Sequence, residues 1–229
     1  MARLARIVIP DIPHHVTQRG NRRETVFFQP GDYQFYLDLL SEAVENTKTE
    51  IWAYCLMPNH VHLIMVPSHI DGLRATLGET HRRYTRFINA RNNWTGHLWQ
   101  GRFGSVAMDE THFSHAIRYV SLNPVRAKLV ERASDWKWSS VNAHLAKKDN
   151  GIVNVQPVLE RYSDFAELLE SGDNEENNTV LRTAETIGRP LGSDAWLDRI
   201  EVLFGSNVRP KKRGRKTSPK NLISKLSPN

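Results

Sequence analysis

A chain of 229 residues can form one full domain with an appendage or two small domains, and a hydrophobic fraction of 39% is enough to bury a core. The single cysteine, Cys55, excludes an internal disulfide framework, and no apolar run reaches the length of a signal peptide or membrane span, so we expect a cytoplasmic protein without membrane association. The net charge of +6 favours a polyanionic partner, although it does not separate DNA, RNA and an acidic membrane.

The first half of the chain has clear turn signals between its predicted elements. The stretch "HHVTQR" predicts a short strand, followed by a Gly-Asn turn and a basic loop, and residues 31–48 have helical spacing of their apolar positions. The segments "IWAYCLM" and "HVHLIMVP" around Pro58-Asn59 predict a β-hairpin. A second, strongly basic helix is expected over residues 71–92.

The next predicted elements are a strand and a helix, which complete the order of strands and helices along the first half of the chain. A fourth strand is expected near residues 103–108, and a third helix begins near residue 110. We expect this helix to end at about Asn123-Pro124, because a residue before proline avoids the helical region. The order β-α-β-β-α-β plus a helix predicts an α+β, ferredoxin-like antiparallel sheet with helices on one face, and an opposite face free to hold a ligand.

The composition changes after about residue 146. We therefore predict a catalytic domain over residues 1–146 and a C-terminal extension over residues 147–229. The acidic stretch "SGDNEENN" is typical of a linker or loop, and one or two small helices are expected after it. The segment "RPKKRGRK" has six cations in eight positions and begins a tail that we expect to be partly disordered.

Two histidines in the predicted hairpin are candidates for metal binding. His60 and His62 lie two residues apart on a strand, so their side chains point to the same face. They could be satisfied polar residues on a half-exposed strand, or they could share a divalent ion. Two histidines without a cysteine cluster are too few for a structural zinc site.

The third helix offers further candidates. Tyr119 and Asn123 are four residues apart, and hence on one helical face. Asn123 has a carboxamide oxygen that suits Mg²⁺ or Mn²⁺, and the Tyr119 phenol is a candidate nucleophile. The alternative for Tyr119 is ordinary packing, which is the commoner use of a tyrosine in an amphipathic helix.

Several separated blocks carry a family resemblance. The segments "YCLMPNHVHLIM" and "RYVSLNPVRAKLV" resemble the IS200-like single-strand DNA transposases, the HUH tyrosine nucleases, and more narrowly the REP-associated tyrosine transposases. The blocks "HHVTQRGNRRE", "HLWQGRF" and "WKWSSVNAH" are similar in the same order, over roughly residues 12–145. The resemblance implies that His60 and His62 bind Mg²⁺ or Mn²⁺ and that Tyr119 forms a 5′-phosphotyrosine. Asn123 stands where a related family often has glutamine as third ligand.

Basic and aromatic residues are the candidates for DNA binding. Arginines around a flexible turn can grip phosphates or read guanine, and the aromatics of "WTGHLWQGRF" suit stacking on unpaired bases. A solvated loop and a packed core are the respective alternatives. The candidate residues are Arg19, Asn21, Arg22, Arg23, Arg82, Arg83, Arg102, Lys211, Lys212, Arg213 and Arg215.

The sequence therefore predicts a metal-dependent transposase that binds single-stranded DNA with a repeated palindromic hairpin and cleaves it. Two alternatives stay open: a non-catalytic nucleic-acid-binding regulator on the same fold, and a metal-dependent phosphoesterase without a covalent intermediate. The sequence does not decide between a monomer and a dimer.

Overall fold

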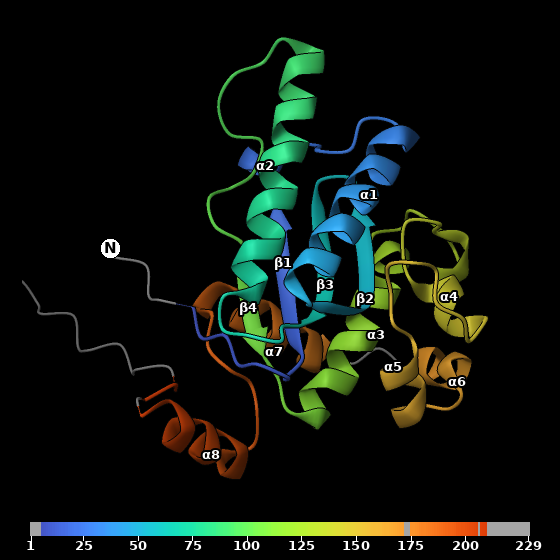
Figure 1. Cartoon of the computed structure of the whole chain (residues 1–229). Helices are drawn as coiled ribbons and strands as arrows, with labels where there is room; N and C mark the ends of the chain where they lie inside the picture. The colour runs from blue at the N-terminus through green and yellow to red at the C-terminus, as the bar shows by residue number, and fades with distance from the viewer. Residues whose placement is uncertain (1–5, 172–174, 206, 210–229) are drawn as a thin grey trace, which may run out of the picture.

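A four-stranded antiparallel sheet forms the centre of the protein (Figure 1). The computed structural model describes residues 6–171, 175–205 and 207–209. The strand order is β2-β3-β1-β4, in which each neighbouring pair is antiparallel. The strands are β1 (His14–Arg19), β2 (Glu50–Met57), β3 (His60–Val66) and β4 (Gly104–Ala107). This is the α+β, ferredoxin-like arrangement that the sequence predicts.

Side-chain alternation divides the residues of the sheet between two apolar clusters. On β3, Val61, Leu63 and Met65 belong to one buried cluster, whereas Ile64 belongs to the other. A strand buried on both faces reads as a nearly continuous apolar run, which is the pattern of "HVHLIMV". The two histidines therefore interrupt an otherwise fully apolar face.

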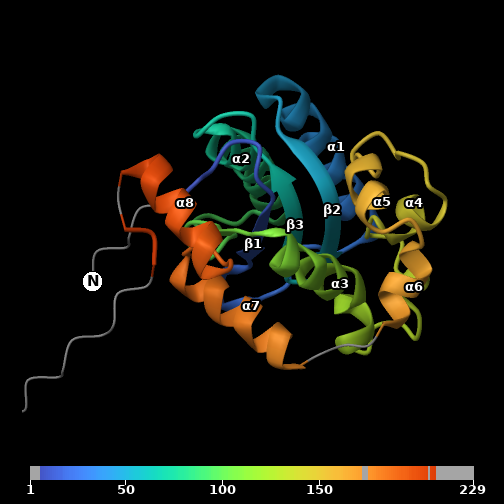
Figure 2. The same cartoon turned by 90° about the horizontal axis from the view of Figure 1, so that it is seen from below.

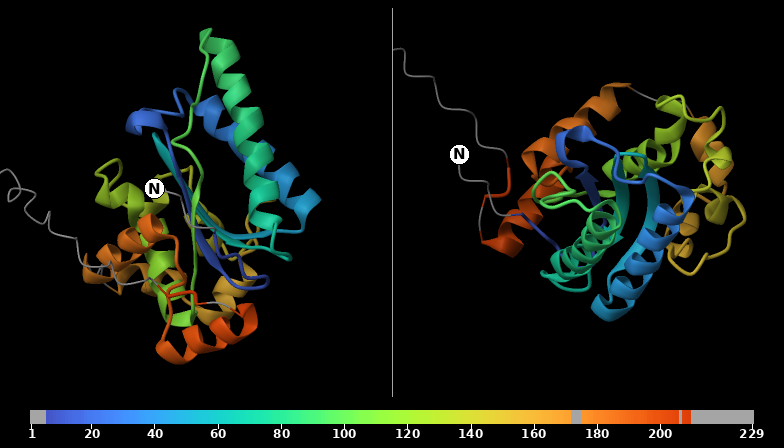
Figure 3. Two further views of the ribbon diagram at one scale, coloured as in Figure 1. Left: turned by 90° about the vertical axis from the view of Figure 1, so that its left-hand side faces the viewer. Right: turned by 90° about the horizontal axis from the view of Figure 1, so that it is seen from above.

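Two long helices cover the first face, as predicted. These are α1 (Pro30–Thr47) and α2 (Gly72–Asn92), which pack against each other and against the sheet (Figures 1 and 3). Asp32 has no exposed side-chain surface and forms an ion pair with Arg91, and it also accepts hydrogen bonds from the backbone N–H groups of Phe28 and Gln29. One carboxylate thus joins the start of α1 to the end of α2.

The opposite face is covered as well, which differs from the open face that the sequence suggested. Helix α3 (Glu110–Arg126) and helix α7 (Glu175–Ile187) lie on this side of the sheet (Figure 2). Their apolar residues, including Phe113, Ile117 and Leu181, share a buried cluster with the β2 residues Ala53 and Cys55. A ligand on this face must therefore bind between the sheet and these helices or at their edge.

Helix α3 continues beyond the point where the sequence predicted its end. Pro124 lies inside the helix, which runs to Arg126. Proline removes one backbone donor, but the helix ends only two residues later, so little of the helix depends on the missing bond. Both Asn123 and Pro124 are buried, and their packing overrides the local preference of a residue before proline.

The described residues after 140 contain more helix than their composition suggests. Its helices are α4 (Val141–Leu145), α5 (Gln156–Arg161), α6 (Phe165–Glu170), α7 and α8 (Asp194–Phe204). Helix α7 begins inside the acidic stretch that the sequence assigned to a linker. The domain boundary at residue 146 stays a prediction. Within the described residues, no helix has the length and apolar character that crossing a membrane requires.

Candidate active site

The register of the sheet places five polar side chains on one face. Arg19 lies opposite His60 and Thr17 lies opposite His62 in the β1–β3 pair, so His15 is two residues from Thr17 on the same face. The His60 and His62 rings are 4.8 Å apart between centroids, and the His15 and His62 rings are stacked at 5.2 Å. Three histidines are thus neighbours on the face that α3 and α7 cover.

The hydrogen bonds of His60 and His62 leave one nitrogen of each ring available. The Nδ1–H of His60 donates to Asn59 Oδ1 at 2.6 Å, and His62 Nδ1 lies 3.0 Å from His15 Nε2. His62 Nε2 is buried, with no hydrogen-bond partner among the described residues. Burial, followed by the nearby charge of Arg19, lowers the pKa of His60 to about 3. Neutral imidazoles with free Nε2 atoms fit a divalent metal ion.

Tyr119 lies against these histidines from the facing helix. Its ring makes edge contacts with His62, at 5.5 Å between centroids, and with His15, at 5.9 Å. The Arg126 guanidinium stacks 4.2 Å from the centre of the Tyr119 ring and donates a hydrogen bond to the Tyr119 carbonyl. Burial and the nearby Glu185 raise the pKa of the phenol, and Arg182 and Arg126 oppose that rise. The nucleophile predicted from the sequence therefore lies beside the predicted metal ligands.

Asn123 lies one turn after Tyr119 on α3 and is 8% exposed. Within the described part of the chain, its carboxamide makes no hydrogen bond to His60 or His62. Its role as a third metal ligand stays a prediction.

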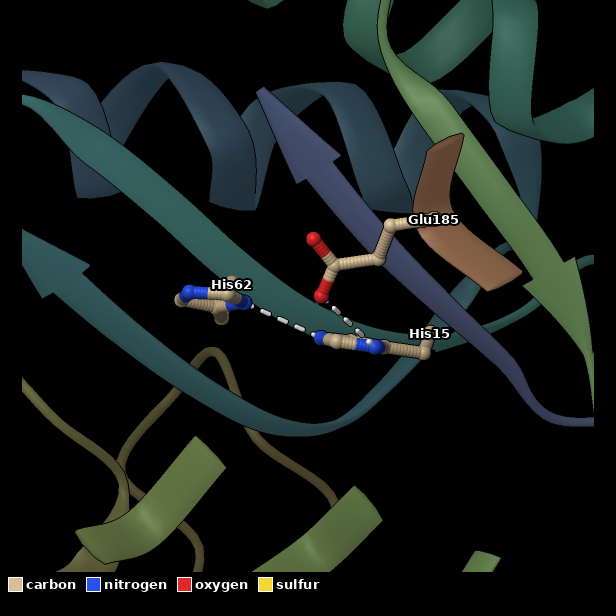
Figure 4. A group of neighbouring side chains, drawn as sticks. All are labelled: His15, His62 and Glu185. Carbon is tan, nitrogen blue, oxygen red and sulfur yellow. Dashed lines mark hydrogen bonds and ion pairs between the residues drawn. The ribbon is translucent and has the colours of Figure 1, made fainter. Parts of the chain in front are cut away.

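Two residues of the site were missed by the sequence analysis. His15 and Glu185 form a group with His62 whose potential ligand atoms all lie within 4.8 Å of one another (Figure 4). The segment "HHVTQR" could have indicated His15 as a site residue, because strand alternation places its side chain on the same face as Arg19. Glu185 gave no signal, since it lies in α7, 123 residues after His62, in a segment for which the sequence predicted only small helices.

The basic turn after β1 has a distinctive backbone. Arg22 and Arg23 adopt positive φ angles of 54° and 64°, a region that side-chain-bearing residues rarely occupy. The Asn59 side chain donates a hydrogen bond to the Arg23 carbonyl and supports this shape. A Cβ atom on Gly20 would lie 2.3 Å from the Glu24 carbonyl, so the turn requires glycine there. The arginine side chains are consequently held at the surface.

A cavity of about 620 Å³ adjoins this turn and is lined by Asn21, Arg22, Phe28 and Trp94, among other residues. Phe28 and Trp94 are 44% and 49% exposed, and their rings are 5.6 Å apart. The structure thus separates the aromatics of the "WTGHLWQGRF" stretch. Trp94 is available for stacking, whereas Trp99 and Phe103 are buried in the core.

The other candidate DNA-binding residues lie in different places. Arg102 and Arg19 line a second cavity, of about 520 Å³, that also reaches Glu185. Arg82 and Arg83 are on α2, across the sheet from Tyr119, and form ion pairs with Glu79 and Glu42. Residues Lys211, Lys212, Arg213 and Arg215 lie outside the described residues. DNA contacts by all of these residues stay predictions.

Comparisons with known proteins agree on one family. The family model described as "Transposase IS200 like" matches residues 9–123. A REP-associated tyrosine transposase of Escherichia coli (strain K12) is 26% identical over 134 residues, which are 58% of this chain and 76% of that protein. A curated relative from Haemophilus influenzae is 25% identical over 149 residues, covering 56% of this chain and 85% of the relative.

The fold comparison points the same way. The solved structure of a REP-associated tyrosine transposase bound to a REP hairpin has a TM-score of 0.56 to this chain and 23% sequence identity. The match covers 68% of this chain and 90% of that one. This likeness confirms the predicted architecture.

Proposed function

The chain belongs to the IS200-like transposase family, and we propose that it cleaves and rejoins single-stranded DNA beside a repeated palindromic hairpin, with Tyr119 as the nucleophile. The observation that carries the proposal is the edge contact between the Tyr119 and His62 rings, at 5.5 Å between centroids. It supports a phenol and a metal ligand acting on the same phosphate.

The proposed reaction is a transfer of the phosphoryl group to tyrosine. The Tyr119 oxygen attacks the scissile phosphorus, a P–O bond forms to the phenol, and the bond to the 3′ oxygen breaks. The products are a 5′-phosphotyrosine and a free 3′-OH, and the phenol proton leaves with the departing strand or solvent. Because the energy of the broken phosphodiester bond is kept in the new ester bond to tyrosine, a 3′-OH can reverse the reaction without a nucleotide cofactor.

His60 and His62 would hold a divalent cation through their Nε2 atoms, with Asn123 as a candidate third ligand. The free, buried His62 Nε2 supports this assignment. When bound, Mg²⁺ or Mn²⁺ would supply Lewis-acid stabilisation of the phosphate and of the leaving oxygen. The protein itself positions the phenol, and Arg126 and Arg182 add positive charge beside it, which favours the phenolate that must form.

The DNA would approach the site along the basic turn. The Arg22 and Trp94 cavity has both a cation for phosphate or base edges and an exposed indole for stacking, the combination that binds unpaired nucleotides. Arg19 lies between this turn and His60, with its guanidinium 3.4 Å from His60 Nδ1. A single strand leaving a hairpin could therefore follow these residues toward Tyr119.

The decisive experiment compares wild type with Tyr119→Phe. We expect the wild-type protein, incubated with Mn²⁺ and a hairpin DNA labelled 3′ of the cleavage site, to form a labelled covalent adduct on a denaturing gel. Tyr119→Phe removes one oxygen and keeps the ring, so it should bind the hairpin with unchanged affinity and form no adduct. Tyr162→Phe is a matched control, because the Tyr162 ring stacks near Phe113, in the first turn of α3, rather than beside Tyr119.

Each alternative has its own signature in this assay. Cleavage without an adduct by the wild type would indicate a phosphoesterase. Tight hairpin binding without cleavage would indicate a regulator. An adduct that persists in Tyr119→Phe would remove the assignment of the nucleophile.

A further inference from the structure

Helix α7 brings an acidic side chain from the C-terminal extension to the histidine cluster. The apolar residues Leu181 and Ala184 of α7 are buried in the cluster that contains Ile117 of α3. A Cβ atom on Gly104 of β4 would lie 3.3 Å from the Glu185 carbonyl, so glycine at this position allows the end of α7 to approach the sheet closely. The position of Glu185 is therefore fixed by packing on two sides.

The Glu185 carboxylate faces one nitrogen of His15, and His62 faces the other (Figure 4). His15 Nδ1 lies 3.5 Å from Glu185 Oε1, and His15 Nε2 lies 3.0 Å from His62 Nδ1. His15 is 1% exposed. Among the described residues, His15 Nδ1 and Glu185 Oε1 have no hydrogen-bond partner, and their separation of 3.5 Å needs to shorten only slightly to form one.

When the Glu185 carboxylate is charged and both imidazoles are neutral, one arrangement of protons suits this chain of groups better than the other. If His15 Nε2 carried the shared proton, its Nδ1 lone pair would face the carboxylate, and the proton of His62 would lie on the buried, unpartnered Nε2. If His62 Nδ1 carries it, His15 Nδ1–H points to Glu185 and His62 Nε2 has a free lone pair. The second arrangement avoids a lone-pair repulsion and a buried unsatisfied donor.

We propose that Glu185 and His15 form a hydrogen-bond relay that holds His62 in the Nδ1–H tautomer and so presents its Nε2 lone pair to the metal ion. Residues that receive the second N–H of a metal-binding histidine fix its tautomer and orientation. Glu185 and His15 are thus positioning residues, and the C-terminal extension contributes to the active site. The inference rests on the proposed function of His62 as a metal ligand.

The same three residues could be considered as a direct metal site, but the geometry favours the relay. An imidazole gives a single ion only one of its nitrogens. His62 and Glu185 approach different nitrogens of His15, so one ion cannot replace both contacts without a rotation of the buried His15 ring.

The first test reads the tautomers directly in metal-free protein. In ¹⁵N-histidine-labelled wild type, long-range ¹H–¹⁵N spectra at pH 8 should show His15 and His62 protonated on Nδ1. Burial raises the pKa of Glu185 to about 7, so its carboxylate is charged under these conditions. A His62 ring protonated on Nε2 would overturn the relay, whether or not the protein cleaves DNA.

The second test measures Mn²⁺ binding by calorimetry. Glu185→Leu removes the hydrogen-bond acceptor that faces His15 Nδ1, so it should weaken Mn²⁺ affinity by about 10- to 100-fold, the usual effect of losing such an outer partner. Glu170→Leu, the same change at an exposed position of α6, should leave the affinity unchanged. Unchanged affinity in Glu185→Leu would overturn the relay alone. A wild type that binds no Mn²⁺ would overturn the proposed function, and with it the metal-presenting role of the relay.

A third measurement separates the relay from direct ligation. Titration with diamagnetic Zn²⁺ should shift the Nε2 resonance of His62 strongly and leave both nitrogens of His15 protonated or hydrogen-bonded as before. A coordination shift on a His15 nitrogen would make His15 a ligand and overturn the relay.

Discussion

Buried histidines are a recurrent feature of this protein, and their hydrogen bonds decide their charge. His14, the neighbour of His15, points to the other face of β1 and has no exposed surface. Its Nδ1–H donates to the Ile12 carbonyl at 2.7 Å, and its Nε2 accepts from the Ile9 backbone N–H at 3.1 Å. Both nitrogens are committed in the neutral form, so protonation must break a backbone hydrogen bond.

This commitment predicts acid sensitivity of the fold. Burial lowers the pKa of His14 from 6.5 to about 4, and the bond to Ile12 opposes the decrease. Between these pH values the unfolded chain binds a proton at His14 that the native protein does not. The contribution of His14 to the free energy of unfolding is therefore fully present above pH 6.5 and is lost as the pH decreases toward 4. The free energy of unfolding, measured by urea denaturation, should decrease between pH 7 and pH 4 by about 3 kcal/mol less in His14→Gln than in wild type.

An exposed histidine provides the control for this measurement. His69→Gln should retain the full acid dependence of the wild type, because His69 lies at the surface. If the free energy of unfolding of His14→Gln and His69→Gln decreases equally between pH 7 and pH 4, His14 is not the group that binds a proton only in the unfolded chain.

The site residues show what single positions in a sequence can and cannot reveal. The i, i+2 spacing of His60 and His62 and the i, i+4 spacing of Tyr119 and Asn123 are local, so the elements alone predict which face each pair occupies. Glu185 reaches the site through the packing of a helix that begins in an acidic stretch. No local pattern records that long-range contact.

At the scale of elements, the turn after β1 and the segment after α2 together form one surface. The positive φ angles of Arg22 and Arg23 and the exposed Phe28–Trp94 pair border the same cavity. The residues proposed to contact an unpaired strand therefore come from two segments, one at Arg22 and one at Trp94, that are about 70 residues apart in the chain.

Removing the Trp94 indole tests this surface. Trp94→Ala should weaken binding of a hairpin with a single-stranded flank by about 1–3 kcal/mol, the usual contribution of one base–aromatic stack. Binding of the same hairpin without the flank should not change. Ile70→Ala, which shortens another exposed apolar side chain, should affect neither DNA. Equal weakening on both DNAs would assign Trp94 to the hairpin or to folding rather than to the flank.

Element boundaries followed from the sequence where the local signal and the packing agree. The hairpin around Pro58-Asn59 and the helices over residues 31–48 and 71–92 have both strong periodicity and turn residues at their ends. Helix α3 passes through Pro124 because the buried side chains outweigh the local preference. A helix was expected after the acidic stretch, but α7 begins earlier, at Glu175, because its first turn is acidic, a pattern that an exposed loop shares.

At the scale of the whole molecule, the order of elements was sufficient to predict the sheet. A β-α-β-β-α-β order has few compact solutions, and the antiparallel β2-β3-β1-β4 sheet is the one observed. The order does not determine what covers the second face, since that depends on where the chain goes after α3. The C-terminal helices thus turn an open sheet into a partly enclosed site.

The charge of the whole molecule leads to the last prediction, which concerns the tail. Five cations lie within residues 211–216, beyond the Arg209 side chain that Asp198 and Glu201 hold by ion pairs. If these cations contact phosphates, deletion of residues 210–229 should weaken hairpin binding and reduce the slope of log K against log salt by about 0.9 for each lost phosphate contact. Deletion of residues 217–229 alone removes Lys220 and Lys225 but leaves the five clustered cations in place, and we expect it to keep most of the wild-type slope. Fluorescence anisotropy between 50 and 200 mM salt, the range in which such contacts change affinity most visibly, measures both variants. A slope that is the same in wild type and in the longer deletion would show that the tail does not contact DNA, and the affinity would then depend on the turn after β1 and on Arg19.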